Sequence, residues 1–253
     1  MSDNNTIRFS DRVADYVKYR PGYPTDILPY LQKEIGLDSQ MRVADVGSGT
    51  GILTRLFLEN RNNVYAVEPN DAMRKAAEAA LGNDPGFHSV KGTAEQTTLA
   101  KGSMDVITAG QAFHWFDAGR TKKEFLRISG ENAWAVLIWN ERQVSTPFEK
   151  DYEGLLLQYA TDYRKVDHRN VSPEKIGAFF APRPVKYQTF PNEQVFDFDG
   201  LKGRLLSSSY MPNRDQPGFG SMIDALTKLY EKHSQGDQVI LTYETRVYAG
   251  RLH

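Results

Sequence analysis

Three glycines at alternating positions are the most informative chemical feature of this chain. Gly47, Gly49 and Gly51 follow a short apolar run that carries one carboxylate, Asp45. Glycine has no Cβ, so the backbone can turn sharply there and approach a ligand closely. The helix-like stretch 52–59 comes next, and a helix N-terminus offers unpaired N–H groups to a polar or anionic ligand. The pattern predicts a nucleoside-containing ligand at the mouth of a parallel sheet.

The spacing of the glycines distinguishes between kinds of nucleoside site. A dinucleotide site with the pattern G-x-G-x-x-G would need a glycine where Ile52 stands. A phosphate-binding P-loop would need Gly-Lys-Ser/Thr, and no lysine follows the glycines. A glycine-rich turn that binds no ligand is the remaining alternative.

The segment from Asp45 to Gly51 reads D-x-G-x-G-x-G and resembles motif I of the class I methyltransferases, which use S-adenosylmethionine. That ligand carries an amino acid and no phosphate, so an acidic residue beside the glycines is tolerable. The resemblance implies cofactor contacts from Asp45, Gly47, Ser48, Gly49 and Gly51.

Glu68 stands at the end of the next predicted strand, 17 residues beyond Gly51. In nucleoside sites an acidic residue at this place accepts hydrogen bonds from the ribose hydroxyls. A lysine or arginine would instead have indicated a phosphorylated ribose. We expect Glu68, with Pro69 beside it, at the ribose, and a solvated loop carboxylate is the alternative.

The turn 92–95 follows the third predicted strand. In the resembled family this turn holds the adenine edge, which implies contacts from Thr93, Ala94 and Glu95. Many family members carry aspartate where Thr93 stands, so Glu95 or a backbone carbonyl would have to bind the adenine amino group. A polar turn without a ligand is the alternative.

An aromatic segment, 110–117, follows the fourth predicted strand at the edge where open α/β sheets bind ligands. It resembles the Q-A-x-H-W-F signature of a subgroup of small-molecule methyltransferases that includes trans-aconitate-methyltransferase-like proteins. The resemblance implies that the backbone around Gly110 and Gln111 contacts the methionine part of the cofactor, and that Ala112 also belongs to the cofactor site.

His114 is the candidate general base in this segment, because an unperturbed histidine has a pKa of about 6.5. A purely structural role, in which His114 and Trp115 pack and orient the loop, is the alternative. Trp115 is expected to form a wall of the substrate site or of the core, and Trp139 at the end of the fifth predicted strand is a further candidate for substrate contact.

The N-terminal passage 16–24 resembles the Y-x-x-x-R-P-x-Y-P segment of the same subgroup, in which N-terminal helices close over the cofactor. A guanidinium can form a paired contact with a carboxylate, so Arg20 is expected to clamp the methionine carboxylate, beside Tyr19. Tyr23 is expected on the substrate side. The alternative is an aromatic helix packed on the sheet, with Arg20 on the surface.

The passage 207–212 is similar to a Ser-x-Ser-Tyr segment that lines the acceptor side in the subgroup, which implies substrate contacts from Ser209 and Tyr210. Hydroxyl groups that cap a helix end are the alternative. His168 and Arg169 are too isolated to assign, and no metal-ligand spacing such as H-E-x-x-H is present.

The composition narrows the class of protein. The chain has 253 residues and a formal net charge of -1, so no overall basicity indicates nucleic acid as a partner. It has no cysteine, which excludes disulfides and thiolate metal sites. No stretch resembles a signal peptide or a membrane-spanning helix, so the sequence favours a soluble, cytoplasmic protein with no membrane partner. The oligomeric state cannot be read from the sequence.

Strand and helix patterns alternate five times along the first half of the chain, which predicts a doubly wound parallel α/β sheet with helices on both faces. Strands are predicted at 41–46, 63–67, 87–90, 104–109 and 133–139, then at 185–198 and 238–249. Helices are predicted at 9–24, 25–35 with Thr25 as the cap, 52–59, 71–81, 118–128, 148–166, 201–209 and 219–233.

The resembled fold is Rossmann-like, with seven strands and an antiparallel last strand. We expect one domain over 1–253, divided into N-terminal helices at 1–40, a cofactor-binding core at 41–140, a helical insertion at 141–184 that covers the site, and C-terminal strands and helices at 185–253.

The function expected from the resemblance is transfer of a methyl group from S-adenosylmethionine to an oxygen, carboxylate or nitrogen of a small molecule. For a carboxylate acceptor no base is needed, and Arg142 or Arg214 could supply a positive clamp. The alternatives are a nicotinamide-dependent oxidoreductase and a non-catalytic protein that binds S-adenosylmethionine. A nucleic-acid methyltransferase is a third alternative with the same chemistry, and such an enzyme would need a basic groove.

Overall fold

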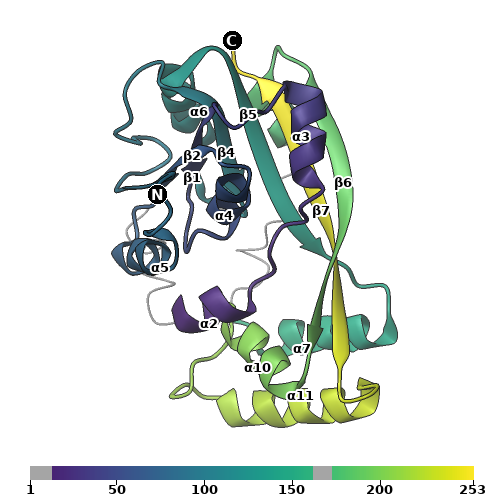
Figure 1. Ribbon diagram of the computed structural model, residues 1–253. Coiled ribbons are helices and arrows are strands. Elements are labelled where there is room, and N and C mark those ends of the chain that lie inside the picture. The colour runs from purple at the N-terminus through teal and green to yellow at the C-terminus, as the bar shows by residue number, and fades with distance from the viewer. Residues whose placement is uncertain (1–12, 162–172) are drawn as a thin grey trace.

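Seven strands form one sheet in the order β3-β2-β1-β4-β5-β7-β6 in the computed structural model, which describes residues 13–161 and 173–253 (Figure 1). The strands are β1 Arg42–Val46, β2 Asn63–Val67, β3 Phe87–Val90, β4 Met104–Gly110, β5 Ser129–Arg142, β6 Val185–Phe196 and β7 Val239–Arg251. The first five strands are parallel, and β7 lies antiparallel between β5 and β6. The Rossmann-like sheet with an antiparallel last strand is therefore confirmed.

Helices cover both faces of the sheet and form a further layer at one end. They are α2 Val13–Tyr19, α3 Ile27–Ile35, α4 Ile52–Glu59, α5 Asp71–Leu81, α6 Ala118–Ile128, α7 Pro147–Tyr159, α9 Pro173–Phe180, α10 Phe198–Leu206 and α11 Phe219–His233, with a 3-10 turn, η2, at Phe113–Trp115.

Alternating side chains of the central strands enter two separate apolar clusters, because successive side chains of a strand point to opposite faces. Val43 and Val106 pack with residues of α3 and α4 on one face. Ala44 and Ile107 pack with residues of α6 and α9 on the other. A strand buried on both faces reads as a continuous apolar run, which is why these strands were recognisable in the sequence.

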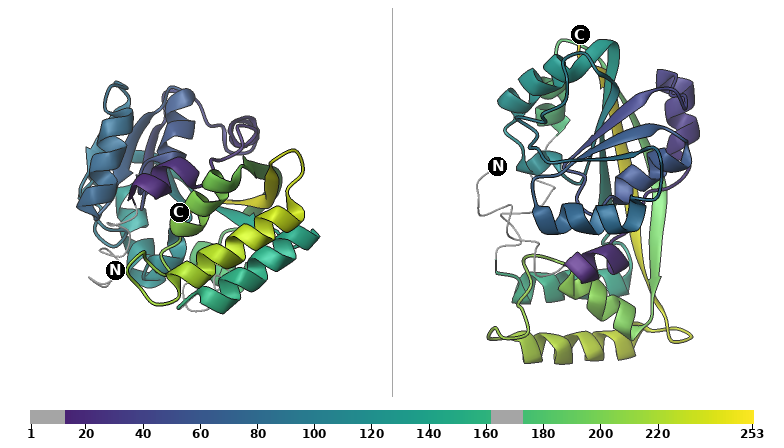
Figure 2. Two further views of the ribbon diagram at one scale, coloured as in Figure 1. Left: turned by 90° about the horizontal axis from the view of Figure 1, so that it is seen from below. Right: turned by 60° about the vertical axis from the view of Figure 1, so that its left-hand side comes forward.

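The third layer consists of α7, α10 and α11, below the sheet core in Figure 1 and again in the side view of Figure 2. β6 and β7 have 12 and 13 residues, so each is about 40 Å long and extends past the short parallel strands. Leu241 and Tyr243 of β7 belong to the apolar core of this helical layer. The long strands thus connect the sheet core to the helical layer, which lies at the carboxyl ends of the parallel strands. Helix α2 lies between the sheet core and this layer (Figures 1 and 2).

Several boundaries differ from the sequence prediction. The second helix starts at Ile27 with Asp26 as its N-cap, so Thr25 does not cap it, and it packs on a sheet face away from the carboxyl ends. β5 continues to Arg142 because β7 supplies hydrogen-bonding partners beyond the apolar run. α7 ends at Tyr159, since Ala160 is extended, and α9 in the predicted insertion was not anticipated as a separate helix. The remainder of the predicted helix 148–166, together with His168 and Arg169, lies outside the described residues.

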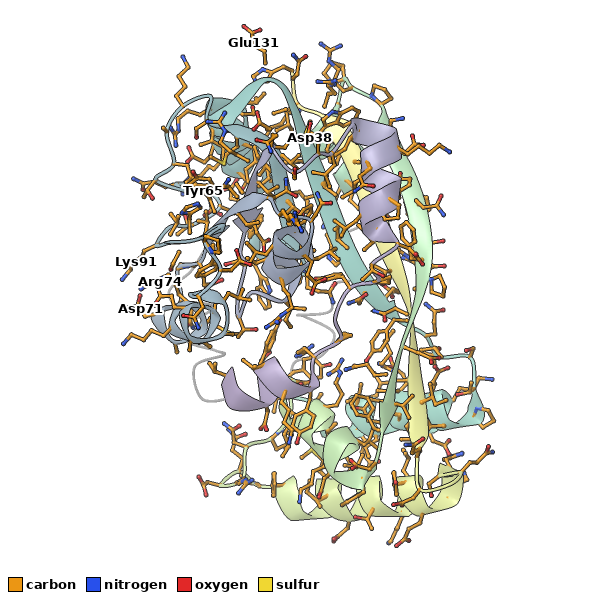
Figure 3. The ribbon with its side chains drawn as sticks, in the orientation of Figure 1. Asp38, Tyr65, Asp71, Arg74, Lys91 and Glu131 are labelled. Atoms are coloured by element: carbon orange, nitrogen blue, oxygen red, sulfur yellow. The ribbon has the colours of Figure 1, made fainter. Side chains whose placement is uncertain are left out.

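The outer side of α5 carries an exposed network of ion pairs. Arg74 contacts Asp71 at 2.6 Å and Glu78 at 2.8 Å, and Lys91 contacts Asp71 at 3.1 Å (Figure 3). Exposed pairs of this kind contribute about 0–1 kcal/mol each, so we regard this face as solvated surface. None of the described helices is long and apolar enough to cross a membrane.

Glu149 anchors the start of α7 to β7. Its Oε2 accepts hydrogen bonds from the backbone N–H groups of Ser145 and Thr146 at 2.9 and 3.0 Å, and its Oε1 accepts one from the N–H of Thr242 at 3.0 Å. Burial raises the pKa of Glu149, but these donors outweigh it and bring the pKa to about 2. The ionised carboxylate therefore stabilises the fold above the unfolded pKa of about 4.3, and this stabilisation is lost as the pH falls toward 2.

We expect Glu149→Ala to lower the free energy of unfolding by about 2–4 kcal/mol, because several donors would lose a charged acceptor. Urea denaturation at pH 7 measures this change. Glu231→Ala, an exposed glutamate on α11, is the matched control and should change stability by less than about 0.5 kcal/mol. Equal effects of the two substitutions would contradict the anchoring role.

Candidate functional site

The predicted site residues gather where the chain reverses its strand order. β1 pairs with β2 on one side and with β4 on the other, so the loops that follow β1 and β4 leave the sheet in neighbouring positions. Ligands of open α/β sheets bind at such a switch point, outside the carboxyl ends of the strands.

All three glycines of the loop after β1 adopt a backbone conformation that favours glycine. Gly47, Gly49 and Gly51 have φ angles of 71°, 58° and 84°, a region that side chains rarely adopt. A Cβ at Gly47 would lie 2.7 Å from the Cβ of Ala112, in the loop after β4. A Cβ at Gly49 would meet nothing within 4 Å. Gly47 is thus required for loop packing, whereas Gly49 leaves its space open to a ligand.

Glu68, at the end of β2, holds this loop in place. Its Oε2 accepts a hydrogen bond from the N–H of Gly49 at 2.9 Å, and its Oε1 accepts one from the N–H of Asn70 at 2.8 Å. The residue is 8% exposed, and burial raises the pKa of its carboxyl group. A carboxylate has about four acceptor positions, so each oxygen keeps capacity for a further donor such as a ribose hydroxyl.

Asp45 lies in β1, two residues before the first glycine of the loop, and is completely buried. Its Oδ2 accepts a hydrogen bond from the Thr54 hydroxyl of α4 at 2.6 Å. Burial raises the pKa of Asp45 to about 7. The hydrogen bond from Thr54 lowers this pKa, and the nearby charge of Glu68 raises it further. Its Oδ1 has no hydrogen-bond partner among the described residues. Asp45 can therefore receive one more donor, and a cationic donor would favour its ionised form.

Two further hydroxyls of the loop, those of Ser48 and Thr50, are buried and have no hydrogen-bond partner in the described part of the chain. Buried polar groups are normally satisfied by protein, water or ligand. Together with Asp45 they supply polar groups for a ligand beside the open space at Gly49.

Gln111 shapes the loop after β4. It adopts a positive φ of 52°, and its side-chain Oε1 accepts a hydrogen bond from the N–H of Asn140 at 3.0 Å. Its own N–H donates to the carbonyl of Ile138 at 2.9 Å. The side chain of Gln111 thus extends the contact between β4 and β5, and the bent backbone brings Ala112 against Gly47.

The aromatic residues near the end of β4 and in β5 differ in burial: some are partly exposed beside the candidate site, and others lie in the core. His114 and Trp115 are partly exposed in η2, with ring centroids 4.8 Å apart. Trp139 is only 4% exposed and packs edge-to-face on Phe113 and Tyr248 at centroid distances of 6.3 and 5.8 Å. The position of Trp139 is that of a core residue, and its contact with substrate stays a prediction.

The turn after β3 is closed by reciprocal backbone hydrogen bonds between Thr93 and Gln96, of 3.0 and 3.2 Å. Ala94 is buried in the core. The Oε1 of Glu95 accepts a hydrogen bond from the N–H of Asp117 at 3.0 Å, which links this turn to the start of α6. Burial raises the pKa of Glu95, but hydrogen bonds such as this one outweigh it and lower the pKa overall. Pro69, after Glu68, is partly exposed.

Tyr23 lies over the end of β4. A Cβ at Gly110 would be 2.5 Å from the Tyr23 hydroxyl, so only glycine fits beneath this ring. Burial raises the pKa of Tyr23 well above its usual value, with further increases from Tyr16 and Asp45. Tyr23 is therefore a neutral hydroxyl close to both the β1 and β4 loops.

A buried amide holds the segment before Tyr23. Asn140 donates from Nδ2 to the carbonyl of Gly22 at 3.0 Å, and Asn192 donates to the same carbonyl at 2.9 Å. The Oδ1 of Asn140 accepts a hydrogen bond from Thr245 at 2.5 Å. These contacts fasten the N-terminal segment to β5, β6 and β7.

The end of α2 faces the helical layer. Arg20 donates from Nη2 to the carbonyl of Ser207 at 2.9 Å, and the ring of Tyr19 lies directly against Gly203 of α10. Ser209 and Tyr210 are partly exposed in the turn after α10, near this contact. The structure thus brings the N-terminal and C-terminal predicted residues together.

Sequence reasoning missed Thr54, Asn140 and Arg204, because a single polar residue in a helix or strand gives no signal of its distant partner. No cluster of three or more potential metal ligands is found in residues 13–161 and 173–253.

Comparison with known proteins identifies relatives that cover up to 95% of the chain. Residues 44–137 match the family described as Methyltransferase domain. A protein of Schizosaccharomyces pombe described as an uncharacterised methyltransferase is 30% identical over 242 residues, 95% of each chain. One of Mycobacterium tuberculosis with the same description is 34% identical over 137 residues, 54% of each chain.

A solved structure from Anaeromyxobacter dehalogenans, described as a candidate Type II methyltransferase, matches with a TM-score of 0.69. It is 22% identical, and the match covers 92% of this chain and 98% of that one. This likeness shows a shared fold.

We expect Gly47→Ala to lower the free energy of unfolding by roughly 2–4 kcal/mol, because left-handed strain adds to the clash with Ala112. Gly218→Ala is the matched control: Gly218 has a φ of 88°, but a Cβ there would meet nothing within 4 Å. That control should cost only about 1–2 kcal/mol. Chemical denaturation of both variants tests the contact between the two loops, and equal losses would contradict it.

Proposed function

The chain belongs to the class I S-adenosylmethionine-dependent methyltransferases, and from this premise we propose that it methylates a small-molecule acceptor. The observation that carries the proposal is the glycine loop, with open space at Gly49 beside the buried acceptors Asp45 and Glu68. Segment 111–116 favours the small-molecule subgroup that includes trans-aconitate-methyltransferase-like proteins.

The polar groups of the loop fit S-adenosylmethionine better than a dinucleotide. Two carboxylates close to the glycines would repel a pyrophosphate, whereas the Oδ1 of Asp45 could accept a hydrogen bond from the methionine ammonium group. Glu68 keeps acceptor capacity for the ribose hydroxyls while it holds Gly49. The proposed cofactor contacts are Tyr19, Arg20, Asp45, Gly47, Ser48, Gly49, Gly51, Glu68, Pro69, Thr93, Ala94, Glu95, Gln111 and Ala112.

S-adenosylmethionine supplies an electrophilic methyl group on a sulfonium when it is bound. The contribution of the chain is to hold the acceptor in line with that group and to exclude water. The acceptor side would be formed by Tyr23, His114, Trp115, Trp139, Ser209 and Tyr210. For a hydroxyl or amine acceptor, His114 would take the proton on an imidazole nitrogen, and a tyrosine is the alternative base.

Calorimetric titration with S-adenosylhomocysteine, in parallel with NAD, tests the proposed cofactor site. We expect micromolar binding of S-adenosylhomocysteine and none of NAD. Gly49→Ala places a methyl group in the open space and should weaken S-adenosylhomocysteine binding at least about tenfold, roughly 1.4 kcal/mol. Gly218→Ala, with the same backbone strain, should bind normally. Absence of S-adenosylhomocysteine binding by the wild type would refute the proposal.

The role of His114 is tested by turnover with an acceptor found by screening small acids, phenols and amines. If His114 is the base, His114→Ala should reduce kcat by about 10²–10⁴-fold and leave S-adenosylhomocysteine affinity unchanged. His88→Ala is the control, because His88 lies in the edge strand β3, where its ring stacks on Tyr65. Unchanged turnover in His114→Ala would remove His114 as the base.

A further inference from the structure

The side chain of Gln111 continues the contact between β4 and β5 after the backbone of β4 has turned away. The N–H of Gln111 donates to the carbonyl of Ile138 at 2.9 Å, and its φ of 52° then turns the backbone away from the strand. Its side-chain amide takes the next place in the ladder: it accepts from the N–H of Asn140 at 3.0 Å and donates to the carbonyl of Asn140 at 3.4 Å. The start of the loop after β4 is therefore fixed on the backbone of Asn140.

The side chain of Asn140 contacts a different part of the chain, the segment that joins α2 to α3 and passes the end of β5 (Figure 1). Asn140 is only 2% exposed, and its Nδ2 donates to the carbonyl of Gly22 at 3.0 Å. Its Oδ1 accepts from Nδ2 of Asn192 at 3.1 Å and from the Thr245 hydroxyl at 2.5 Å. One buried residue therefore holds the loop after β4 with its backbone and the N-terminal segment with its side chain.

The neighbours of this amide determine which way it faces. The Oδ1 of Asn192 accepts from the backbone N–H of Glu193 at 2.9 Å, so the amino group of Asn192 is the side that donates to Asn140 and to the Gly22 carbonyl. An amino donor needs an acceptor opposite it, so the oxygen of Asn140 faces Asn192 and its amino group faces Gly22. Two amide donors thus converge on one carbonyl.

Two prolines make the segment around Gly22 stiff. Pro21 and Pro24 stand on either side of Gly22, and each proline ring fixes its φ near −65°. Pro21 is also buried. Few rotatable backbone bonds therefore separate the Gly22 carbonyl from the side chains before and after it, so a contact at this carbonyl directs the whole segment.

The side chains on both sides of Gly22 belong to the proposed site. Arg20 donates from Nη2 to the carbonyl of Ser207, after α10, at 2.9 Å. Tyr23 lies over Gly110, where a Cβ would be 2.5 Å from its hydroxyl, and Gly110 directly precedes Gln111. The N-terminal segment therefore lies against the base of the loop that Asn140 also holds.

We propose that Asn140 is a positioning residue for the cofactor: through Gly22 it sets Arg20 at the distance from the loop after β4 at which both reach the methionine part. This inference rests on the proposed function, which assigns the methionine carboxylate to Arg20. Asn140 acts without touching the ligand, because its oxygen accepts two hydrogen bonds from the protein and its amino group donates to the protein.

The test compares two ligands by calorimetry on the full chain. S-adenosylhomocysteine has the amino-acid part, whereas 5′-methylthioadenosine has the same adenosine and sulfur but neither the ammonium nor the carboxylate group. Asn140→Leu is similar in shape and has no donor. It should weaken S-adenosylhomocysteine binding about tenfold, the effect of a lost charge-assisted contact, and leave 5′-methylthioadenosine binding within about twofold of the wild type. A purely structural role would weaken the binding of both ligands equally.

Two further leucine variants complete the comparison. Asn192→Leu removes the other donor to the Gly22 carbonyl from a more exposed position, so it tests the same contact at a smaller cost in stability. It should weaken S-adenosylhomocysteine binding about two- to fivefold and leave 5′-methylthioadenosine binding unchanged. Asn132→Leu, at the exposed start of β5, is the matched control and should bind both ligands like the wild type.

A double-mutant cycle tests whether Asn140 acts through Arg20. Arg20→Gln alone should weaken S-adenosylhomocysteine binding about tenfold, because it removes the proposed partner of the carboxylate. In the Asn140→Leu background the same substitution should cost less than about twofold, because Arg20 is then no longer held at the ligand.

The proposal is overturned if Asn140→Leu and Asn192→Leu both bind S-adenosylhomocysteine like the wild type, if the two ligands lose equal affinity, or if the effects of Arg20→Gln and Asn140→Leu multiply. Failure of the proposed function is a different result, since the wild type would then bind no S-adenosylhomocysteine.

Discussion

The carboxylate of Glu68 joins the ends of two neighbouring strands, and the geometry of the site depends on this contact. It accepts one hydrogen bond from the N–H of Gly49, in the loop after β1, and another from the N–H of Asn70, at the start of α5. A loop with three left-handed residues has many conformations in the unfolded chain, so a strong acceptor is needed to select one. We propose that the same carboxylate accepts hydrogen bonds from the ribose, so that loop geometry and ligand recognition would depend on one group.

The long strands β6 and β7 explain how distant parts of the chain reach this edge. They carry the helical layer of α7, α10 and α11 to the carboxyl ends of the parallel strands, where α2 lies between the layer and the core (Figure 2). Asn140 and Asn192 then fasten the segment before Tyr23 through a single carbonyl, that of Gly22. The residues that we propose for the acceptor side therefore come from separate parts of the chain.

Local signals in the sequence were sufficient for the cofactor half of the fold. The helices α4, α5 and α6 have the predicted bounds, and the caps of two of them are visible in the sequence: Asn70 accepts hydrogen bonds from the N–H groups of Ala72 and Met73, and Asp117 accepts one from Arg120. The glycine spacing also indicated the ligand class correctly, since it depends on backbone geometry within a few residues.

Contacts between distant residues could not be predicted in this way. Asn140 and Gly22 are 118 residues apart, and neither belongs to a recognisable motif. Arg204 is one of many arginines in the sequence, and its burial on α10 became visible in the structure alone. β5 is also longer than the sequence predicts. Its last residues are polar, and they belong to the strand because they pair with β7 and not because of their own strand propensity.

A crystal structure of the protein with S-adenosylhomocysteine would show whether Glu68 binds the ribose and the glycine loop at the same time. We expect both ribose hydroxyls to donate to Glu68 while the Gly49 N–H keeps its hydrogen bond to the same carboxylate, and we expect the methionine part to lie beside Asp45. A ligand bound elsewhere, or a glycine loop that releases Glu68 on binding, would contradict it.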